Sequence, residues 1–292
     1  MTLAVTFPGQ GSQQPGAGAP WQHTEGWGLV EEGSSALGRD LAALLLDTPA
    51  DELRRPWEAQ VSTYLVSMLT WGAWWPGGDA PVALAGHSLG EWTALAASGA
   101  VSFAAGLRLV SARGTAMAAA AQARPGTMAA LLGAADAEVE AACAAAVDVW
   151  PANYNGAGQV VISGDGGAFA QVADAAGARR VLPLPVGGAY HTPFMESARA
   201  PLAAALAADP PGVAAIPIWS NVDAAPHIDG FTDRLLAQLT APVRWRQTVE
   251  GLVAAGVDEL LELGPGTVLT GLARRLAPSA RLRHLANPEE LA

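Results

Sequence analysis

Hydrophobic positions in this chain form short apolar runs that alternate with longer stretches rich in alanine and leucine. Short apolar runs are typical of buried parallel strands, and the stretches between them are typical of helices that cover a sheet. The runs that predict strands lie at residues 3–7, 81–85, 127–132, 159–163, 180–186, 216–220 and 258–263. The stretches that predict helices lie at residues 33–46, 58–75, 90–98, 103–120, 136–147, 167–177, 194–208, 231–238, 245–255 and 267–276. The pattern therefore predicts an α/β fold.

One region departs from this alternation. From about residue 126 the predicted order becomes strand, helix, strand, strand, helix, strand, with the second strand at residues 147–153. This β-α-β-β-α-β order is that of a ferredoxin-like unit. We predict a small ferredoxin-like subdomain over residues 125–187, inserted into a large α/β-hydrolase-like domain formed by residues 1–124 and 188–292. The cleft between the two is the expected ligand site.

Composition narrows the class further. The chain has 292 residues, of which 51% are hydrophobic, so it can bury a substantial core. Its formal net charge of −11 argues against nucleic acid or an anionic membrane as a partner, because both would repel it. The single cysteine, Cys143, allows neither a disulfide framework nor a cysteine metal site within one chain. Without a basic leader or a long apolar stretch, the sequence favours a cytoplasmic protein.

The most informative motif is a serine between two glycines. Ser88 follows an apolar strand and is flanked by Gly86 and Gly90, which is the G-x-S-x-G pattern of a nucleophile elbow. Such a turn exposes the serine at the end of the strand, and the backbone N–H of Leu89 can stabilise an oxyanion beside it. The alternative is a chance match in a chain with 33 glycines.

A serine nucleophile needs a base, and the chain has five histidines. His191 is the best candidate because it follows a predicted strand and the flexible bend at residues 187–189. His87 adjoins Ser88, but neighbouring side chains diverge on a tight elbow. His227 lies in a predicted exposed turn. The alternative for His191 is a structural histidine in the core.

Arg113 lies among small and apolar residues, which is unusual for a surface arginine. A fixed guanidinium can bind a carboxylate through two parallel hydrogen bonds, as an acidic acyl substrate requires. The alternative is an arginine at a helix end that complements the helix dipole.

Three segments rich in glycine, glutamine and asparagine lie at residues 7–13, 152–156 and 263–267. The first and third follow predicted strands, where open α/β sheets present ligand-binding loops. Gly11 or a neighbour is expected to offer a backbone N–H near Ser88. A phosphate-cradling loop is poorly supported, because the G-x-x-x-x-G-K-[ST] pattern is absent.

Together these motifs resemble those of the malonyl-CoA:acyl carrier protein transacylases and of the acyltransferase domains of polyketide and fatty acid synthases. The matching segments run nearly from end to end of the chain. They are FPGQGSQ at 7–13, GHSLGE at 86–91, Arg113-Gly114 with Met117, ANYN at 152–155, GQVVISG at 158–164, GAYH at 188–191, PVRW at 242–245, GPG at 264–266 and VLT at 268–270.

The resemblance implies catalytic roles for five positions. Ser88 would be the acylated nucleophile and His191 its base. Gln238 matches the residue whose main-chain carbonyl orients the imidazole in place of an aspartate. Gln10 and Leu89 would form the oxyanion hole through their backbone N–H groups.

The resemblance also implies a substrate site. Arg113 would bind the free carboxylate of the malonyl group, with Met117 and Asn155 nearby in supporting roles. Tyr190 stands where the family often has a phenylalanine associated with malonyl over α-branched groups. The aromatic bulk is kept, so malonyl is favoured, with methylmalonyl or a rarer extender unit left open.

The implied reaction is ping-pong transfer of malonyl from CoA to the phosphopantetheine thiol of an acyl carrier protein, in fatty acid or polyketide biosynthesis. No cofactor or metal is expected, since the phosphopantetheine belongs to the partner. We expect a monomer that contacts its acidic carrier through Arg179-Arg180 or Arg274-Arg275. The alternatives are an editing thioesterase or hydrolase of the same fold, or a subunit of a malonate-processing complex.

Overall fold

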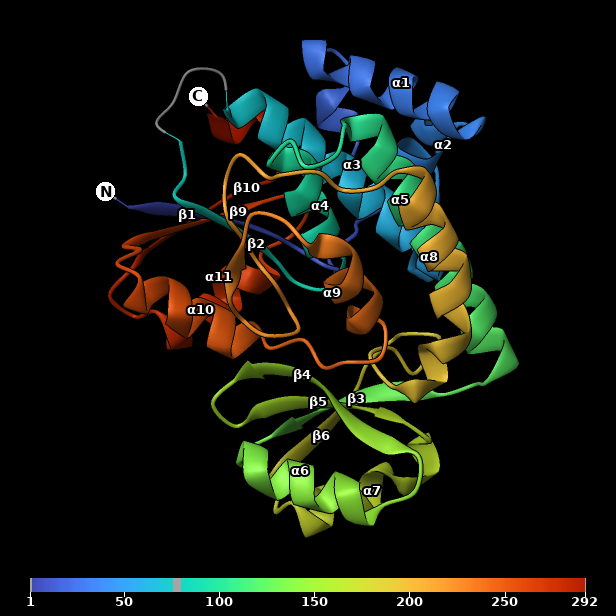
Figure 1. Cartoon of the computed structure of the whole chain (residues 1–292), viewed down its shortest axis with the longest axis vertical. Coiled ribbons are helices and arrows are strands. Elements are labelled where there is room, and N and C mark those ends of the chain that lie inside the picture. The colour runs from blue at the N-terminus through green and yellow to red at the C-terminus, as the bar shows by residue number, and fades with distance from the viewer. Residues whose placement is uncertain (1, 76–79, 292) are drawn as a thin grey trace.

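The computed structural model describes residues 2–75 and 80–291, and its strands form two separate sheets (Figure 1). All neighbouring pairs in the larger sheet are parallel except the last, in which β8 runs antiparallel to β7. In spatial order its strands are β10 (Arg281–Leu285), β9 (Glu259–Leu263), β1 (Leu3–Phe7), β2 (Ala83–Gly86), β7 (Ile218–Trp219) and β8 (Pro226–His227). The predicted α/β class with a largely parallel sheet is confirmed.

Helices lie on both faces of this sheet, and α1 and α2 pack outside α3 and α5. The helices of the large domain are α1 (Gly28–Leu37), α2 (Leu41–Leu46), α3 (Pro56–Trp74), α4 (Leu89–Ala97), α5 (Phe103–Ala123), α8 (Arg199–Ala208), α9 (Phe231–Gln238), α10 (Trp245–Ala254) and α11 (Val268–Leu276). Side chains alternate along β1, so Val5 and Phe7 enter the core beneath α3, α4 and α5, while Ala4 enters the core beneath α10 and α11. Burial on both faces explains why the strands are continuous apolar runs.

The single helix predicted over residues 33–46 is wrong, because the structure has two. Gly38 ends α1 in the left-handed conformation, with φ of 62°. Asp40 then begins α2 by accepting a hydrogen bond from the N–H of Ala43. The next long helix, α3, starts with Pro56 in its first turn, where a missing N–H costs nothing.

The smaller sheet is antiparallel, in the order β4-β5-β3-β6, and α6 (Asp136–Ala145) and α7 (Phe169–Ala175) lie on one of its faces (Figure 1). Its strands are β3 (Thr127–Leu132), β4 (Val149–Gly156), β5 (Gln159–Gly164) and β6 (Arg180–Pro183). The order and the intervening helices are those of the predicted ferredoxin-like unit. All four strands fall within residues 125–187, so we retain these limits as the proposed small subdomain.

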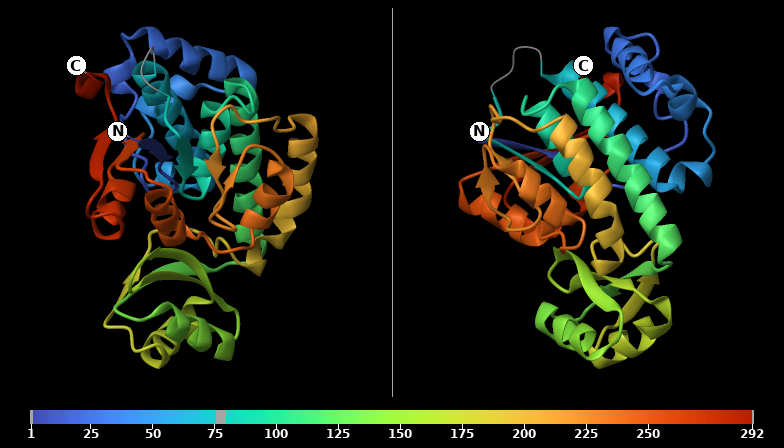
Figure 2. Two further views of the ribbon diagram at one scale, coloured as in Figure 1. Left: turned by 60° about the vertical axis from the view of Figure 1, so that its left-hand side comes forward. Right: turned by 45° about the vertical axis from the view of Figure 1, so that its right-hand side comes forward.

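Two long helices and one strand edge join the small subdomain to the large domain. α5 and α8 lie side by side and both extend toward the small subdomain (Figure 2). The N–H of Tyr154 in β4 donates to the carbonyl of Val243, and the N–H of Val243 donates to the carbonyl of Ala152, each at 2.9 Å. These bonds fix one wall of the cleft between the two units.

The sequence pattern did not predict β8 or β10, and it predicted a strand longer than β6. β10 has an Arg-Leu-Arg-His-Leu pattern and lies at the sheet edge, where its charged side chains reach solvent. β8 has only two residues, His227 among them, and the predicted exposed turn there is instead a partly buried strand end. The strand predicted over 180–186 ends at Pro183.

Candidate functional site

The chain turns sharply between β2 and α4, and Ser88 lies at the turn. Its backbone is strained, with φ of 53° and ψ of −101°. A Cβ at Gly86 would collide with the backbone of Gly90, and one at Gly90 would collide with the carbonyl of Phe7. Both glycines are therefore required for this close packing, as the elbow motif predicts.

Ser88 meets His191 across 103 residues of chain. The serine Oγ lies 2.8 Å from His191 Nε2, and His191 Nδ1 lies 2.9 Å from the backbone carbonyl oxygen of Gln238. A carbonyl only accepts hydrogen bonds, so Nδ1 carries the proton and Nε2 is free to accept the serine proton. Burial lowers the pKa of His191 to about 3, with a further contribution from the Arg113 charge, so the imidazole is neutral.

Arg113 lies within α5, not at a helix end, so the helix-end alternative is wrong. Its guanidinium is buried and donates to the side-chain oxygens of Gln60 at 2.7 Å and Gln238 at 3.1 Å. It also donates to Ser88 Oγ at 3.0 Å. Burial lowers the pKa of Arg113 to about 10, which leaves it a cation at neutral pH.

Within residues 2–75 and 80–291, no carboxylate forms an ion pair with Arg113, and its Nε has no hydrogen-bond partner. An unpaired cation is costly to bury, because neutral acceptors replace its hydration only in part. The site is therefore electrostatically suited to a bound carboxylate.

The Gln238 side chain links several of these groups. Its amide oxygen accepts from Arg113 and from Trp92 Nε1, the latter at 3.1 Å. Its amide nitrogen donates to the carbonyl of Ser88 at 3.0 Å and to Glu91 Oε2 at 2.7 Å. The backbone carbonyl of Gln238 thus contacts the His191 imidazole, and its side chain contacts the Arg113 guanidinium.

Asn221 supports the strained elbow and was missed by sequence reasoning. Its Oδ1 accepts from the N–H of Ser88 at 2.7 Å, and its Nδ2 donates to the carbonyl of Gly86 at 2.6 Å. Its position just after β7 was the available signal, since residues at the carboxyl ends of parallel strands converge. Gln60 was also missed, and Glu91, which ends the matched GHSLGE segment, was given no role. Nothing in the local sequence shows that these polar residues are buried together.

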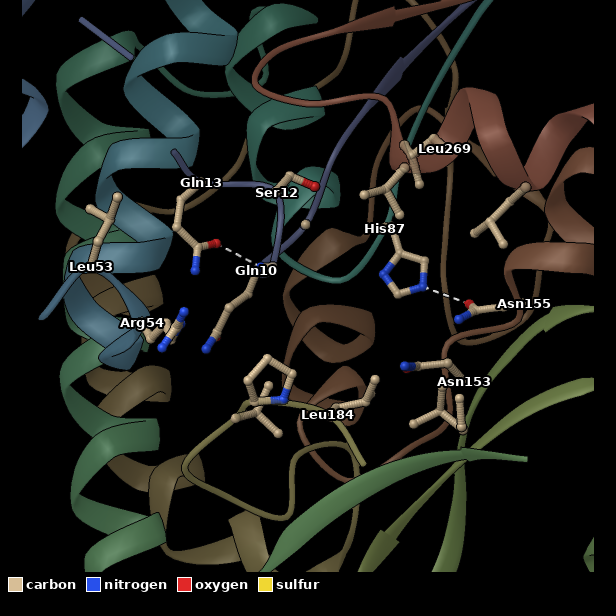
Figure 3. Close-up of a pocket in the computed structure, with 18 of the residues that line it drawn as sticks. Gln10, Ser12, Gln13, Leu53, Arg54, His87, Asn153, Asn155, Leu184 and Leu269 are labelled. Carbon is tan, nitrogen blue, oxygen red and sulfur yellow. Dashed lines mark hydrogen bonds between the residues drawn. The ribbon is translucent and has the colours of Figure 1, made fainter. Parts of the chain in front are cut away.

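His87 points away from Ser88, as predicted. Its Nε2 lies 2.9 Å from Asn155 Oδ1, a contact that joins the large domain to β4 of the small subdomain (Figure 3). Burial lowers its pKa. His227 Nε2 instead lies 2.9 Å from Asp223 Oδ2.

A cavity of about 560 Å³ opens beside His87 (Figure 3). Gln10 and Arg54 lie on one side, and His87, Asn153 and Asn155 lie on the other. Ser88, Arg113 and His191 do not line it, although His87, which adjoins Ser88 in the sequence, does.

The two proposed oxyanion donors flank the elbow. The N–H of Leu89 is the first of α4 and has no acceptor within the helix. No acceptor for the Gln10 N–H occurs in the described part of the chain. The N–H of Gly11 donates to the side chain of Gln13 at 2.7 Å, so of the expected donors in this loop we retain the neighbouring Gln10.

Tyr190 and Met117 are both buried. No described residue forms a hydrogen bond of good geometry with the Tyr190 hydroxyl. Burial raises the pKa of this hydroxyl, while a weaker contact with the Gln10 side-chain amide and the Arg113 charge oppose the rise. Met117 lies 3.5 Å from Gln60 Nε2 through its sulfur, so it shares a partner with Arg113.

Among residues 2–75 and 80–291, no cluster of three or more histidine, cysteine, aspartate or glutamate side chains is arranged to hold a metal ion. No helix there combines the length and apolar character needed to cross a bilayer. Cys143 is buried and unpaired.

A sharp strand–helix turn, a serine–histidine pair and a buried arginine together define a serine acyltransferase-type site. Residues 5–280 match the family model of the acyl transferase domain, and the chain belongs to this family. The resemblance expected from the motifs is thereby confirmed.

The malonyl CoA-acyl carrier protein transacylase of Escherichia coli strain K12 is 40% identical to this chain over an alignment 303 residues long. The alignment covers 99% of this chain and 97% of that protein. A crystal structure of the malonyl-CoA:acyl carrier protein transacylase of Xanthomonas oryzae pv. oryzae is similar, with a TM-score of 0.93, 40% identity and coverage of 99% and 95%. A complex of a type II PKS acyl-carrier protein with its malonyl-transacylase has a TM-score of 0.93, 37% identity and coverage of 100% and 98%.

Proposed function

We propose that this chain transfers malonyl from malonyl-CoA to the phosphopantetheine thiol of an acyl carrier protein through an acyl ester on Ser88. One observation carries the proposal: the same serine oxygen contacts a neutral imidazole and an unpaired guanidinium. A base and a carboxylate-binding group therefore meet at one nucleophile. The names of the similar proteins, malonyl CoA-acyl carrier protein transacylases, support this substrate pair.

The first half-reaction acylates Ser88. Its oxygen attacks the thioester carbonyl carbon while His191 Nε2 takes the hydroxyl proton. The backbone N–H groups of Gln10 and Leu89 stabilise the negative oxygen of the tetrahedral intermediate. The carbon–sulfur bond then breaks, and His191 returns the proton to the leaving CoA sulfur.

The second half-reaction reverses these roles. His191 takes the proton from the phosphopantetheine thiol, the sulfur attacks the ester carbonyl, and the carbon–oxygen bond to Ser88 breaks. The serine oxygen recovers the proton from His191. Side chains and backbone amides perform every step, so the proposed mechanism uses no cofactor.

Arg113 selects for a carboxylated acyl group. A malonyl carboxylate would replace Ser88 as the acceptor on the guanidinium and release the serine oxygen for attack. Gln60 would remain bonded to the same guanidinium and keep it in place. An uncharged acyl group offers no such exchange and leaves the cation without a counter-charge.

Tyr190 limits the size of that group. Its ring packs against Gly188, where an added Cβ would lie 2.8 Å from the ring and 2.9 Å from the Cβ of Ala121. The ring therefore has little room to withdraw from an α-substituent. We accordingly propose malonyl as the substrate in preference to methylmalonyl or bulkier extender units.

The carrier and CoA would approach through the cleft between the subdomains. Arg54 lines its cavity, and an adjoining groove of about 300 Å³ between the β4–β5 hairpin and α11 contains Arg275. Both cations suit the phosphate of a pantetheine arm. Arg179 and Arg180 line neither space, so we favour Arg275 as the carrier contact.

We further propose that the protein acts as a monomer in the cytoplasm and transfers the acyl group without hydrolysing it. All the proposed catalytic groups come from one chain, which supports action as a monomer. The single unpaired cysteine, Cys143, supports a cytoplasmic setting. The buried Arg113 and the relatives' names favour transfer over an editing hydrolase or a non-catalytic complex subunit.

Intact-mass spectrometry after incubation with malonyl-CoA tests the proposal. We expect one malonyl adduct, mapped to Ser88, that disappears when a phosphopantetheinylated acyl carrier protein is added and reappears on that carrier. Ser88→Ala should form no adduct. A wild-type chain that remains unmodified would exclude the acyl-serine route.

A further inference from the structure

Glu91 is a buried polar residue that the proposed mechanism does not use. It lies in the first turn of α4, three residues after Ser88, and its side chain is 1% exposed. Within the described residues it forms no ion pair with arginine or histidine. Its charge acts at longer range on the Arg113 guanidinium, whose pKa it raises, and its direct hydrogen bonds identify the groups that it holds in place.

One of these bonds leads to Ser88. Glu91 Oε2 accepts from the backbone N–H of Asn221 at 3.0 Å. The side chain of Asn221 in turn accepts from the N–H of Ser88 and donates to the carbonyl of Gly86. The carboxylate thus fixes the residue that holds the strained elbow from both sides.

A second bond leads to His191. The same Oε2 accepts from Gln238 Nε2 at 2.7 Å. Gln238 is the last residue of α9, and its backbone carbonyl receives the Nδ1 proton of His191. Fixing the Gln238 side chain therefore limits movement of the carbonyl that orients the imidazole.

We propose that Glu91 is a positioning residue: one carboxylate oxygen, acting through Asn221 and Gln238, sets the alignment of Ser88 with His191. This inference rests on the proposed acyl-serine chemistry. Misplacement of reacting groups by about 1 Å can cost roughly 100-fold in rate, so the effect should appear in turnover. Glu91 does not touch the acyl group, so substrate affinity should change little.

Substitution by methionine and by glutamine separates positioning from packing. E91M keeps the length and volume of the side chain but removes the acceptor, which leaves two buried N–H donors unpaired. E91Q keeps one amide oxygen that can accept both bonds. We expect E91M to lower kcat by about 30-fold or more, with KM within threefold of wild type. E91Q should restore kcat to within about threefold of wild type.

A second readout needs neither a carboxylated acyl group nor a carrier. Phenylmethylsulfonyl fluoride reacts directly with an activated serine, so the rate of Ser88 sulfonylation reports the serine–histidine pair alone. We expect E91M to slow this reaction by a factor similar to its loss in kcat. If E91M unfolds too readily for turnover measurements, E91D is the substitute, because it withdraws the oxygens by one methylene.

Glu259 provides the matched control. It too is a glutamate 1% exposed, but it lies in β9 and pairs with Arg283 at 3.2 Å at the sheet edge. E259M should lower Tm while leaving kcat and the sulfonylation rate unchanged. A loss of Tm alone in E91M, with kcat and sulfonylation within twofold of wild type, would overturn the positioning role.

The two proposals fail in distinguishable ways. If wild type forms no malonyl adduct but E91M still slows sulfonylation, the proposed function is wrong and the positioning role stands. If wild type transfers malonyl and E91M changes only KM, the positioning role is wrong and the function stands.

Discussion

The two parts of the site are built differently. Around Ser88, side chains from α3, α4, α5 and α9 are buried and joined by hydrogen bonds of 2.7–3.1 Å. The cleft beside it is an open cavity of about 560 Å³ with loop residues and an exposed arginine, Arg54, along its walls. Bond-making requires fixed geometry, whereas passage of two different thiol carriers requires space. Substitutions in the first region should therefore have larger effects than those in the second.

The largest effect is expected at His191. His191→Ala removes the general base while Ser88 stays in place, so kcat for malonyl transfer should fall about 10²–10⁴-fold. Steady-state assays of malonyl-CoA consumption with a carrier protein measure this. His227→Ala is the control, since that imidazole pairs with Asp223 and should be dispensable. Equal rates in the two variants would refute the assignment of the base.

Arg113→Ala should lower kcat/KM for malonyl-CoA by about 10- to 100-fold, because it removes the charged hydrogen bonds to the carboxylate. Discrimination against acetyl-CoA should fall, as measured by the ratio of kcat/KM values. Arg108→Ala on the same helix removes an exposed ion pair with Asp209, and its cost in stability should be at most about 1 kcal/mol. Unchanged malonyl kinetics in Arg113→Ala would exclude the carboxylate-binding role.

Titration of Glu91 should make the free energy of unfolding depend on pH. Burial raises the pKa of its carboxyl from 4.5 to about 7, and the charge of Asp223 adds to this while hydrogen bonds from Asn221 and Gln238 oppose it. The folded state therefore holds the proton more tightly than the unfolded state. This contribution to stability is fully present below pH 4.5 and is lost as pH rises through 7.

Urea unfolding of wild type and E91Q at pH 5 and pH 8 measures that contribution. E91Q cannot titrate, so wild type should lose about 2.5 kcal/mol relative to it between the two pH values. A constant difference would mean that Glu91 is ionised throughout, and the buried region would then tolerate a full negative charge.

Substitutions of Tyr190 test whether its ring or its hydroxyl selects the acyl group. Tyr190→Phe keeps the ring and removes the unpartnered hydroxyl, so the preference for malonyl-CoA over methylmalonyl-CoA should persist. Tyr190→Ala should raise the relative kcat/KM for methylmalonyl-CoA by about 10-fold, the value of one methyl group in a packed pocket. Competition between the two thioesters measures the ratio. Loss of the preference in Tyr190→Phe would transfer selection from the ring to the hydroxyl.

The smallest effect is expected in the open groove. Arg275→Glu should raise KM for the carrier protein about 3- to 10-fold with kcat unchanged, since charges at the edge of an interface act on encounter. This increase in KM should be smaller at high salt, because salt screens the repulsion between the introduced glutamate and the acidic carrier protein. Arg180→Glu on β6 is the comparison, and its KM should match that of wild type. If KM for the carrier protein rises only in Arg180→Glu, the docking surface lies on the small subdomain.

The sequence predicted most elements of the fold because their signals are local. Apolar runs identified β1, β3 and β9, and the β-α-β-β-α-β order indicated the antiparallel sheet. The failures were local as well: the apolar periodicity continued across Gly38, and the charged edge strand β10 lacked an apolar run.

The candidate site was predicted unevenly for the same reason. The elbow at Ser88 is readable in five residues, because both glycines are demanded by backbone contacts within that turn and with β1. Residue patterns alone left His191 and Arg113 with structural alternatives, and the family resemblance supplied their expected roles. Neither pattern nor resemblance indicated Asn221, and Glu91 ends the matched GHSLGE segment without an assigned role. The Ser88–Asn221 and Glu91–Asn221 hydrogen bonds span 133 and 130 residues of sequence.

The sequence by itself thus determined the elbow, the alternation of strands and helices, and the family to which the chain belongs. Only the tertiary structure decided that one serine oxygen contacts both His191 and Arg113, and that one buried carboxylate supports both Asn221 and Gln238. The physical reason is that local sequence fixes backbone conformation. Long-range packing decides which polar groups lose water together and must satisfy one another.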